Sequence, residues 1–172
     1  HESDEVRWSA AKAIPQVADK NDRCAIDAVC MYLEHGDLTA REAAIIALAF
    51  TVDRGDPYAM DAVIGRFQHL SAAARAASVM GLAQVAVKND RRAVTEAAKL
   101  MEDSEPVVRF AAVESLSMVA ESGNQHCIDE VISRFGHEVA DVRRTAVNAI
   151  IQVTEKGDLY AIKEVLARLP HE

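Results

Sequence analysis

Residues 108–141 read VRFAAVESLSMVAESGNQHCIDEVISRFGHEVAD, and their pattern recurs along the whole chain. The arginine at the second position of this stretch returns every 34 residues, at Arg7, Arg41, Arg75, Arg109 and Arg143. A fixed period of this size is typical of proteins built from stacked copies of one small structural unit. We therefore divide the 172 residues into five repeats, 6–39, 40–73, 74–107, 108–141 and 142–172.

The first half of every repeat has the apolar spacing of an α-helix, which we call helix A. Small or apolar residues stand four positions after the arginine, at Ala11, Ile45, Val79, Val113 and Val147. Larger apolar residues stand seven positions after it, at Ile14, Leu48, Leu82, Leu116 and Ile150. Positions with these offsets share one face of a helix, so we expect helix A to bury that face.

Two adjacent positions then separate helix A from a second helix, which we call helix B. The first holds only Gly or Asn, the residues that most readily adopt a left-handed conformation and end helices: Asn21, Gly55, Asn89, Gly123 and Gly157. The second holds side chains that accept hydrogen bonds from the free N–H groups of a new helix: Asp22, Asp56, Asp90, Asn124 and Asp158. We therefore expect helix A to end at the first position and helix B to start at the second.

Helix B again has one apolar face, carried by Ile26, Met60, Val94, Ile128 and Ile162 and by Val29, Val63, Ala97, Val131 and Val165. Two amphipathic helices joined by a short turn form an antiparallel pair. Five such pairs in tandem predict an all-α solenoid, in which each pair buries its apolar face against its neighbours and no central core exists.

The stretch DSEPVVRFAA at residues 103–112, together with DVRRTA at 141–146, resembles the start of a HEAT repeat. The short period is similar to the HEAT-like family that includes phycobilisome chromophore lyases. The resemblance implies a right-handed α-solenoid of five 34-residue antiparallel helix pairs, forming one domain over residues 1–172. Tetratricopeptide repeats share the period, but their Trp, Leu-Gly and Tyr pattern is missing, because Trp8 is the only tryptophan and its equivalents are Glu42, Ala76, Phe110 and Arg144.

Composition excludes several partners and suggests a compartment. The net charge of −8 disfavours nucleic acid and anionic membranes, which both require a basic face. The longest stretch without a charged residue, 76–87, is shorter than the roughly 20 apolar residues of a membrane-spanning helix. Cys24, Cys30 and Cys127 form no CxxC pair and are odd in number, which suggests a reducing compartment and a cytoplasmic location.

Two further positions recur with the repeat. The arginine lies in the first turn of helix A, so we expect it to bind carbonyl groups at the end of the preceding helix B or an acidic side chain in the turn. Histidine recurs at His1, His35, His69, His137 and His171, with Asp103 in the third repeat. Neighbouring repeats stand roughly 10 Å apart, whereas metal ligands lie about 2 Å from the ion, so this series cannot form one metal site. We expect these histidines to meet unsatisfied carbonyls at the end of helix B.

These features predict a non-catalytic protein-interaction scaffold, with no cofactor and no metal. One alternative is a HEAT-repeat enzyme, either similar to the chromophore lyases or to the di-iron hydroxylase that acts on deoxyhypusine. In the hydroxylase family a His-Glu pair directly follows the arginine, where this chain has pairs such as Trp8-Ser9 and Phe110-Ala111. No GxGxxG, GxxxxGK[ST], HExxH or GxSxG motif occurs. A second alternative is a purely structural spacer.

In HEAT-like stacks the B helices usually line the concave side, so the resemblance implies a partner-binding ridge along helix B. The positions there vary between repeats and carry mixed charges, which suggests a protein or peptide partner with some basic character. The predicted partner-binding residues are Tyr58, Asp61, Arg92, Glu96, Lys99, His126, Asp129, Tyr160 and Lys163. His1-Glu2 repeats the phase of His137-Glu138, so we expect a segment of a longer array, with uncapped terminal repeats open to end-to-end self-association.

Overall fold

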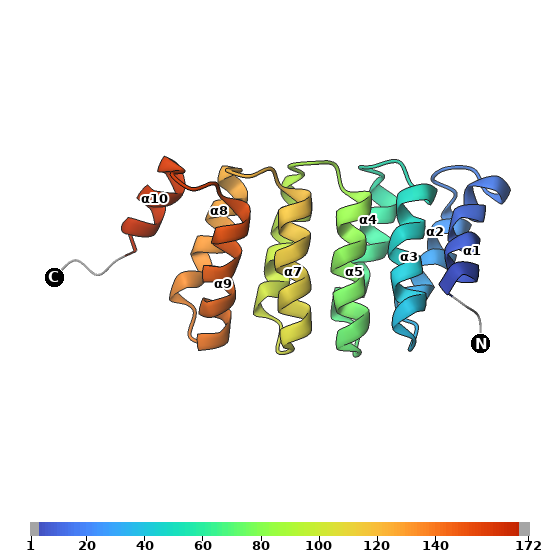
Figure 1. The fold of residues 1–172 in the computed structure, drawn as a ribbon, viewed down its shortest axis with the longest axis horizontal. Helices are drawn as coiled ribbons and strands as arrows, with labels where there is room; N and C mark the ends of the chain where they lie inside the picture. Colours follow the sequence, from blue (N-terminus) through green and yellow to red (C-terminus); the bar gives the residue numbers. More distant parts are fainter. Residues whose placement is uncertain (1–3, 169–172) are drawn as a thin grey trace. The chain divides into compact units, whose positions relative to one another are not determined.

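The computed structural model describes residues 4–168 and confirms an all-α fold over that range, with ten α-helices, three short 3-10 helices and no strand. The chain divides into two compact units, His1–Val87 and Lys88–Glu172. The boundary falls inside the third repeat, between its two helices. Figure 1 shows the helices of each unit, coloured from blue to green in the first and from yellow to red in the second.

The first unit contains three A helices, α1 (Asp4–Val17), α3 (Leu38–Thr51) and α5 (Ala72–Val85). Its B helices are α2 (Arg23–Tyr32) and α4 (Pro57–Ile64), the latter followed by the 3-10 helix η1 (Gly65–Gln68). Helix α1 packs on α3, α3 packs on α5, and α2 packs on α4, so like helices of consecutive repeats lie side by side (Figure 1).

The second unit has the same arrangement. Its A helices are α7 (Pro106–Val119) and α9 (Ala140–Val153), and its B helices are α6 (Arg91–Lys99), α8 (Gln125–Ile132) and α10 (Leu159–Leu166). The 3-10 helices η2 (Leu100–Glu102) and η3 (Ser133–Gly136) extend α6 and α8. Helix α7 packs on α9, and α8 packs on both α6 and α10. Packing between consecutive repeats is what a solenoid requires.

The predicted apolar positions form the core of both units. In helix A, Leu48, Leu82 and Leu116 are fully buried. In helix B, Ile26, Val94 and Ile128 are fully buried as well. These side chains stand at the same position of different repeats, so one short apolar pattern, repeated, supplies most of the buried surface.

The Asp or Asn that precedes helix B caps that helix, as predicted. In every repeat its side chain accepts a hydrogen bond from the backbone N–H three residues later, at 2.8–2.9 Å. Such a cap satisfies one of the N–H groups that a helix leaves without an intrahelical partner, and is worth about 1 kcal/mol.

The preceding Gly or Asn is left-handed, as predicted, but it does not end helix A. Its φ is +62° at Asn21, +64° at Asn89 and between +82° and +94° at the three glycines. Helix A ends four residues earlier, for example at Thr51 before Gly55, and is followed by extended backbone at Val52. The prediction of a C-cap at this position was therefore wrong, and the left-handed residue has another role.

That role is a backbone hydrogen bond to the next repeat. The N–H of Asn21 donates to the carbonyl of Thr51, the last residue of the next helix A, at 2.9 Å. Gly55 donates to Val85 at 2.7 Å in the same way. In the second unit, Asn89 donates to Val119 at 2.8 Å and Gly123 to Val153 at 2.9 Å. The left-handed conformation aims the N–H toward the neighbouring repeat, and the bond satisfies a carbonyl at the end of a helix.

Candidate partner-binding surfaces

The recurring arginine holds the turn between repeats, as predicted. In each of four repeats its Nη1 donates to two consecutive backbone carbonyls of the turn before helix A. Arg109, for example, donates to the carbonyls of Asp103 and Ser104, both at 2.8 Å. Arg41, Arg75 and Arg143 make the equivalent pairs. The side chain of Arg7 lies outside the described part of the chain.

The recurring histidine also acts in this turn, but not as predicted. Nδ1 of His35, His69 and His137 accepts a hydrogen bond from the backbone N–H two residues later, at 3.0–3.1 Å. A ring nitrogen that accepts from an N–H carries no proton of its own, so the predicted donation to carbonyls is wrong for this nitrogen. In the third repeat Oδ1 of Asp103 accepts from Glu105 N–H at 2.9 Å. An acceptor is what the position requires, and Asp supplies it as well as His. His1 and His171 lie outside the described residues.

The sequence gave no warning of a set of ion pairs that join alternate repeats. Glu34 Oε1 lies 2.7 Å from Arg66 Nε in the first unit, and Glu102 Oε1 lies 2.9 Å from Arg134 Nε in the second. The side chain of Arg134 is 8% exposed, which makes its pair the better shielded of the two. The acid and the arginine come from neighbouring repeats, so each pair fixes one repeat against the next.

On the helix-B ridge of the first unit, Tyr58 forms a small cluster with two residues of α2. Its hydroxyl lies 2.8 Å from both carboxylate oxygens of Asp27, and the guanidinium of Arg23 lies 4.8 Å from the centre of its ring. The hydrogen bond to Asp27 raises the pKa of Tyr58 above its usual value. Asp61, one turn further along α4, is exposed.

The ridge of the second unit contains three local groups. Tyr160 of α10 donates to Asp129 Oδ1 at 2.6 Å, which raises the pKa of Tyr160 to about 12. Lys99 donates to Glu96 at 2.7 Å within α6. His126 Nε2 lies 2.9 Å from the hydroxyl of Thr95, which donates to Glu130 of α8.

The structure thus joins two pairs of the predicted ridge residues, Asp129 with Tyr160 and Glu96 with Lys99. Tyr58 and His126 instead contact residues outside the predicted set, namely Asp27 and Thr95. The remaining predicted residues, Asp61, Arg92 and Lys163, are exposed on α4, α6 and α10. Most contacts on the ridge therefore link a helix B with the helix B of the next repeat.

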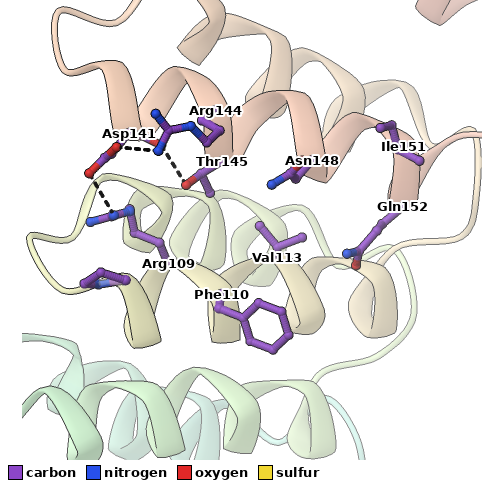
Figure 2. Close-up of a pocket in the computed structure, with 10 residues that line it drawn as sticks. Arg109, Phe110, Val113, Asp141, Arg144, Thr145, Asn148, Ile151 and Gln152 are labelled. Atoms are coloured by element: carbon purple, nitrogen blue, oxygen red, sulfur yellow. Dashed lines mark hydrogen bonds and ion pairs between the residues drawn. The ribbon is translucent and has the colours of Figure 1, made fainter.

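A second surface, which the sequence reasoning missed, is a groove of about 540 Å³ between the A helices α7 and α9. Figure 2 shows Phe110 and Val113 on α7, facing Asn148, Ile151 and Gln152 on α9. Phe110 is 61% exposed and Ile151 71%, which is unusual for such large apolar side chains.

One end of the groove is polar. Asp141 lies between two arginines, 3.5 Å from Arg109 Nη2 and 2.8 Å from Arg144 Nη1, while the Thr145 hydroxyl donates to the Asp141 carbonyl (Figure 2). The groove therefore combines an apolar middle with an end that carries a net positive charge. Phe110 directly follows the recurring arginine, at a position where the other repeats have no common residue type, so periodicity gave no signal there.

The thiol groups differ in exposure. Cys24 is exposed, whereas Cys30 and Cys127 are buried. Burial raises the pKa of Cys30 to about 11 and that of Cys127 to about 12, so both thiols are protonated near neutral pH. Within residues 4–168, no group of three or more His, Cys, Asp or Glu side chains is arranged to hold a metal ion. No helix in the same range has the length and apolar character needed to cross a membrane.

Comparisons with known proteins give two results. A family model described as HEAT repeats matches residues 60–150. The crystal structure of an engineered protein from the Northeast Structural Genomics Consortium aligns with a TM-score of 0.44 and 18% identity, over 89% of this chain and 76% of that one. No curated protein is similar enough to count as a match.

Proposed function

The chain belongs to the HEAT-repeat family, and we propose that it is a non-catalytic scaffold whose helix-B ridge binds a protein or peptide partner with basic character. HEAT repeats generally mediate protein interactions. The ridge is the part of this chain where side chains differ most between repeats while the frame beneath them stays constant. Variable side chains on a constant frame suit recognition of a specific partner.

The observation that carries the proposal is the fixed position of two exposed carboxylates. Asp27 and Asp129 each accept a hydrogen bond from a tyrosine of the next helix B, Tyr58 and Tyr160. A carboxylate offers about four acceptor sites, so sites remain for a second donor. Because the tyrosines hold the carboxylates in place, binding of a lysine or arginine would lose less side-chain entropy than binding to a free aspartate.

The aromatic rings beside these carboxylates add apolar contact area. Tyrosine is among the residues most often found at the energetic centre of protein interfaces, since it buries a large ring and loses little conformational freedom. In the first unit, Arg23 already lies over the ring of Tyr58. That contact shows that the ring attracts a guanidinium, and an arginine of a partner would find the same chemistry at Tyr160.

The absence of catalysis is part of the proposal and has its own support. A cysteine nucleophile acts as the thiolate, and burial holds Cys30 and Cys127 in the protonated form. Metal analysis and an absorption spectrum of the purified protein test the point. Stoichiometric iron or a bound tetrapyrrole would favour the enzyme alternative.

The binding test uses a library of short lysine- and arginine-rich peptides, with affinity measured by fluorescence polarisation. We expect Asp27→Asn and Asp129→Asn each to weaken the best peptide about fivefold, the effect of one exposed charge pair. The matched control is Phe110→Ser in the groove between α7 and α9, which should leave the affinity unchanged. Weaker binding in the control alone would place the partner on helix A. If no peptide binds, and replacing Tyr58 and Tyr160 by Ala alters no interaction, the chain is a structural spacer.

A further inference from the structure

Repeat 5 exposes apolar side chains that are buried in the other repeats. At one position of helix B, Ile26, Val94 and Ile128 are fully buried, whereas Ile162 of α10 is 46% exposed. At one position of helix A, Val113 is 3% exposed and Val147 of α9 is 48% exposed. In repeats 1 and 4 the helices of the following repeat in the same unit pack against this side, so the exposed side chains mark the face where a further repeat would pack.

The same face carries an unused backbone donor. The left-handed residues of repeats 1 to 4 each donate their N–H to the last carbonyl of the next helix A. Gly157 has the same left-handed conformation, with φ of +94°, and its N–H has no acceptor within residues 4–168. At the opposite end of the chain, the carbonyl of Val17 closes α1 at the position equivalent to Thr51, and none of the described N–H groups outside the helix donates to it. The two ends thus offer one donor and one acceptor of the same hydrogen bond.

The charges at the two ends are complementary as well. Within the first unit, Lys20 donates to Asp53 of the next repeat at 2.9 Å. The residue equivalent to Lys20 in repeat 5 is Lys156, and the residue equivalent to Asp53 in repeat 1 is Asp19. Both side chains are exposed. A second copy placed after repeat 5 would therefore bring Asp19 to Lys156 in the way that the chain brings Asp53 to Lys20.

We propose that copies of this chain associate head to tail, with repeat 1 of one copy packed on repeat 5 of another. Helices α1 and α2 of the second copy take the places that α9 and α10 occupy against α8. Gly157 N–H donates to the Val17 carbonyl of the second copy, Lys156 pairs with Asp19, and the side of Ile162 is covered. This contact goes beyond the proposed partner binding and does not depend on it.

The two surfaces in this contact are different, so a copy that has bound one neighbour still has a free end. Such contacts build open chains or rings rather than closed dimers. We therefore expect the mass in solution to rise continuously with concentration above the 18.7 kDa of one chain. Sedimentation velocity over a wide concentration range measures this directly.

Two sets of variants test the geometry. Ile162→Glu should leave the chain monomeric, whereas Ile151→Glu, the same change at an isoleucine that lines the α7–α9 groove, should not. Ile162 is already 46% exposed, so its variant should fold, and circular dichroism checks this. Lys156→Glu and Asp19→Lys should each weaken association about two- to fivefold, and the double variant should restore it, because exposed ion pairs are worth up to about 1 kcal/mol.

Crosslinking provides a positional readout. Residues equivalent to Asp27 contact residues equivalent to Tyr58 on the next repeat, so Lys163 should face Cys24 of the second copy. A Lys163→Cys variant treated with a short bis-maleimide should form dimers and longer species linked between Cys24 and position 163. The control Asn148→Cys, on α9, should not. A chain that stays monomeric at all concentrations overturns the proposal, as does association that Ile162→Glu and the charge reversals leave intact.

Discussion

Asn89 provides a sharp test of how the repeats are joined. It is left-handed, with φ of +64°, and its N–H donates to the carbonyl of Val119 at 2.8 Å. Its side chain also accepts from Glu121 N–H at 2.8 Å and from Asn124 Nδ2 at 3.0 Å. Replacing Asn89 by Gly and by Ala separates these contributions, because both variants lose the side chain and only alanine resists the left-handed conformation.

The magnitudes follow from these contacts. Each lost hydrogen bond destabilises the fold by about 0.5–1.5 kcal/mol, and water reaches this turn, so we expect about 1–2 kcal/mol in total for Asn89→Gly. Asn89→Ala loses the same bonds and adds about 1–2 kcal/mol for a left-handed alanine, which gives about 2–4 kcal/mol. In a chain of this size each kcal/mol lowers the melting temperature by about 2–4 °C.

Urea unfolding followed by circular dichroism measures both variants. Gly123→Ala is the matched control, since Gly123 has φ of +82° and no side-chain bond to lose, so the strain alone should appear. Its new Cβ would also stand 3.2 Å from Asp158 Oδ2. If Asn89→Ala is no less stable than Asn89→Gly, the left-handed backbone does not determine the residue type at this position, and our account of the joint fails.

Three further outcomes are expected. Arg109→Lys should lower the free energy of unfolding by about 2 kcal/mol, because a lysine cannot hold the two carbonyls in the same geometry, whereas Arg143→Lys, at an exposed site, should lower it less; equal losses would contradict this. In the folded protein at pH 8, a maleimide should label Cys24 and spare the two buried thiols until urea is added, as mass spectrometry would show. In a variant with Tyr160 as its single tyrosine, absorbance at alkaline pH should place the ionisation near pH 12, and Asp129→Asn should lower that midpoint; an unchanged midpoint would show that the hydrogen bond is not its cause. Because folding raises this pKa, the hydrogen bond stabilises the fold at neutral pH, and its contribution disappears between the ordinary tyrosine value near 10 and about 12.

The parts of the fold that depend on nearby residues were predictable from sequence. The N-cap of helix B depends only on a side chain and an N–H three residues later, as with Asp22 and Ala25, so residue type was enough. The left-handed residues were recognised for the same reason. Their role was misread because the acceptor, such as Thr51 for Asn21, lies in another repeat. A capping rule describes one helix end and contains no information about the neighbouring repeat.

The candidate surfaces were harder to predict. The ridge tyrosines were chosen for their chemistry, but their contacts with Asp27 and Asp129 cross from one helix B to the next and emerged only from the packing. The groove on helix A brings together Phe110 and Ile151, which occupy different positions of their repeats. A search for positions that recur every 34 residues does not detect such a pair.

The joint between left-handed residue and following helix has a consequence for how such a protein changes over generations. It consists of main-chain N–H and C=O groups, which every residue except proline provides in full. Gene duplication or deletion that adds or removes whole 34-residue units therefore rejoins compatible ends, whatever amino acids the ridge displays. Length and surface chemistry become separately adjustable, so selection on the ridge leaves the mechanical continuity of the array untouched.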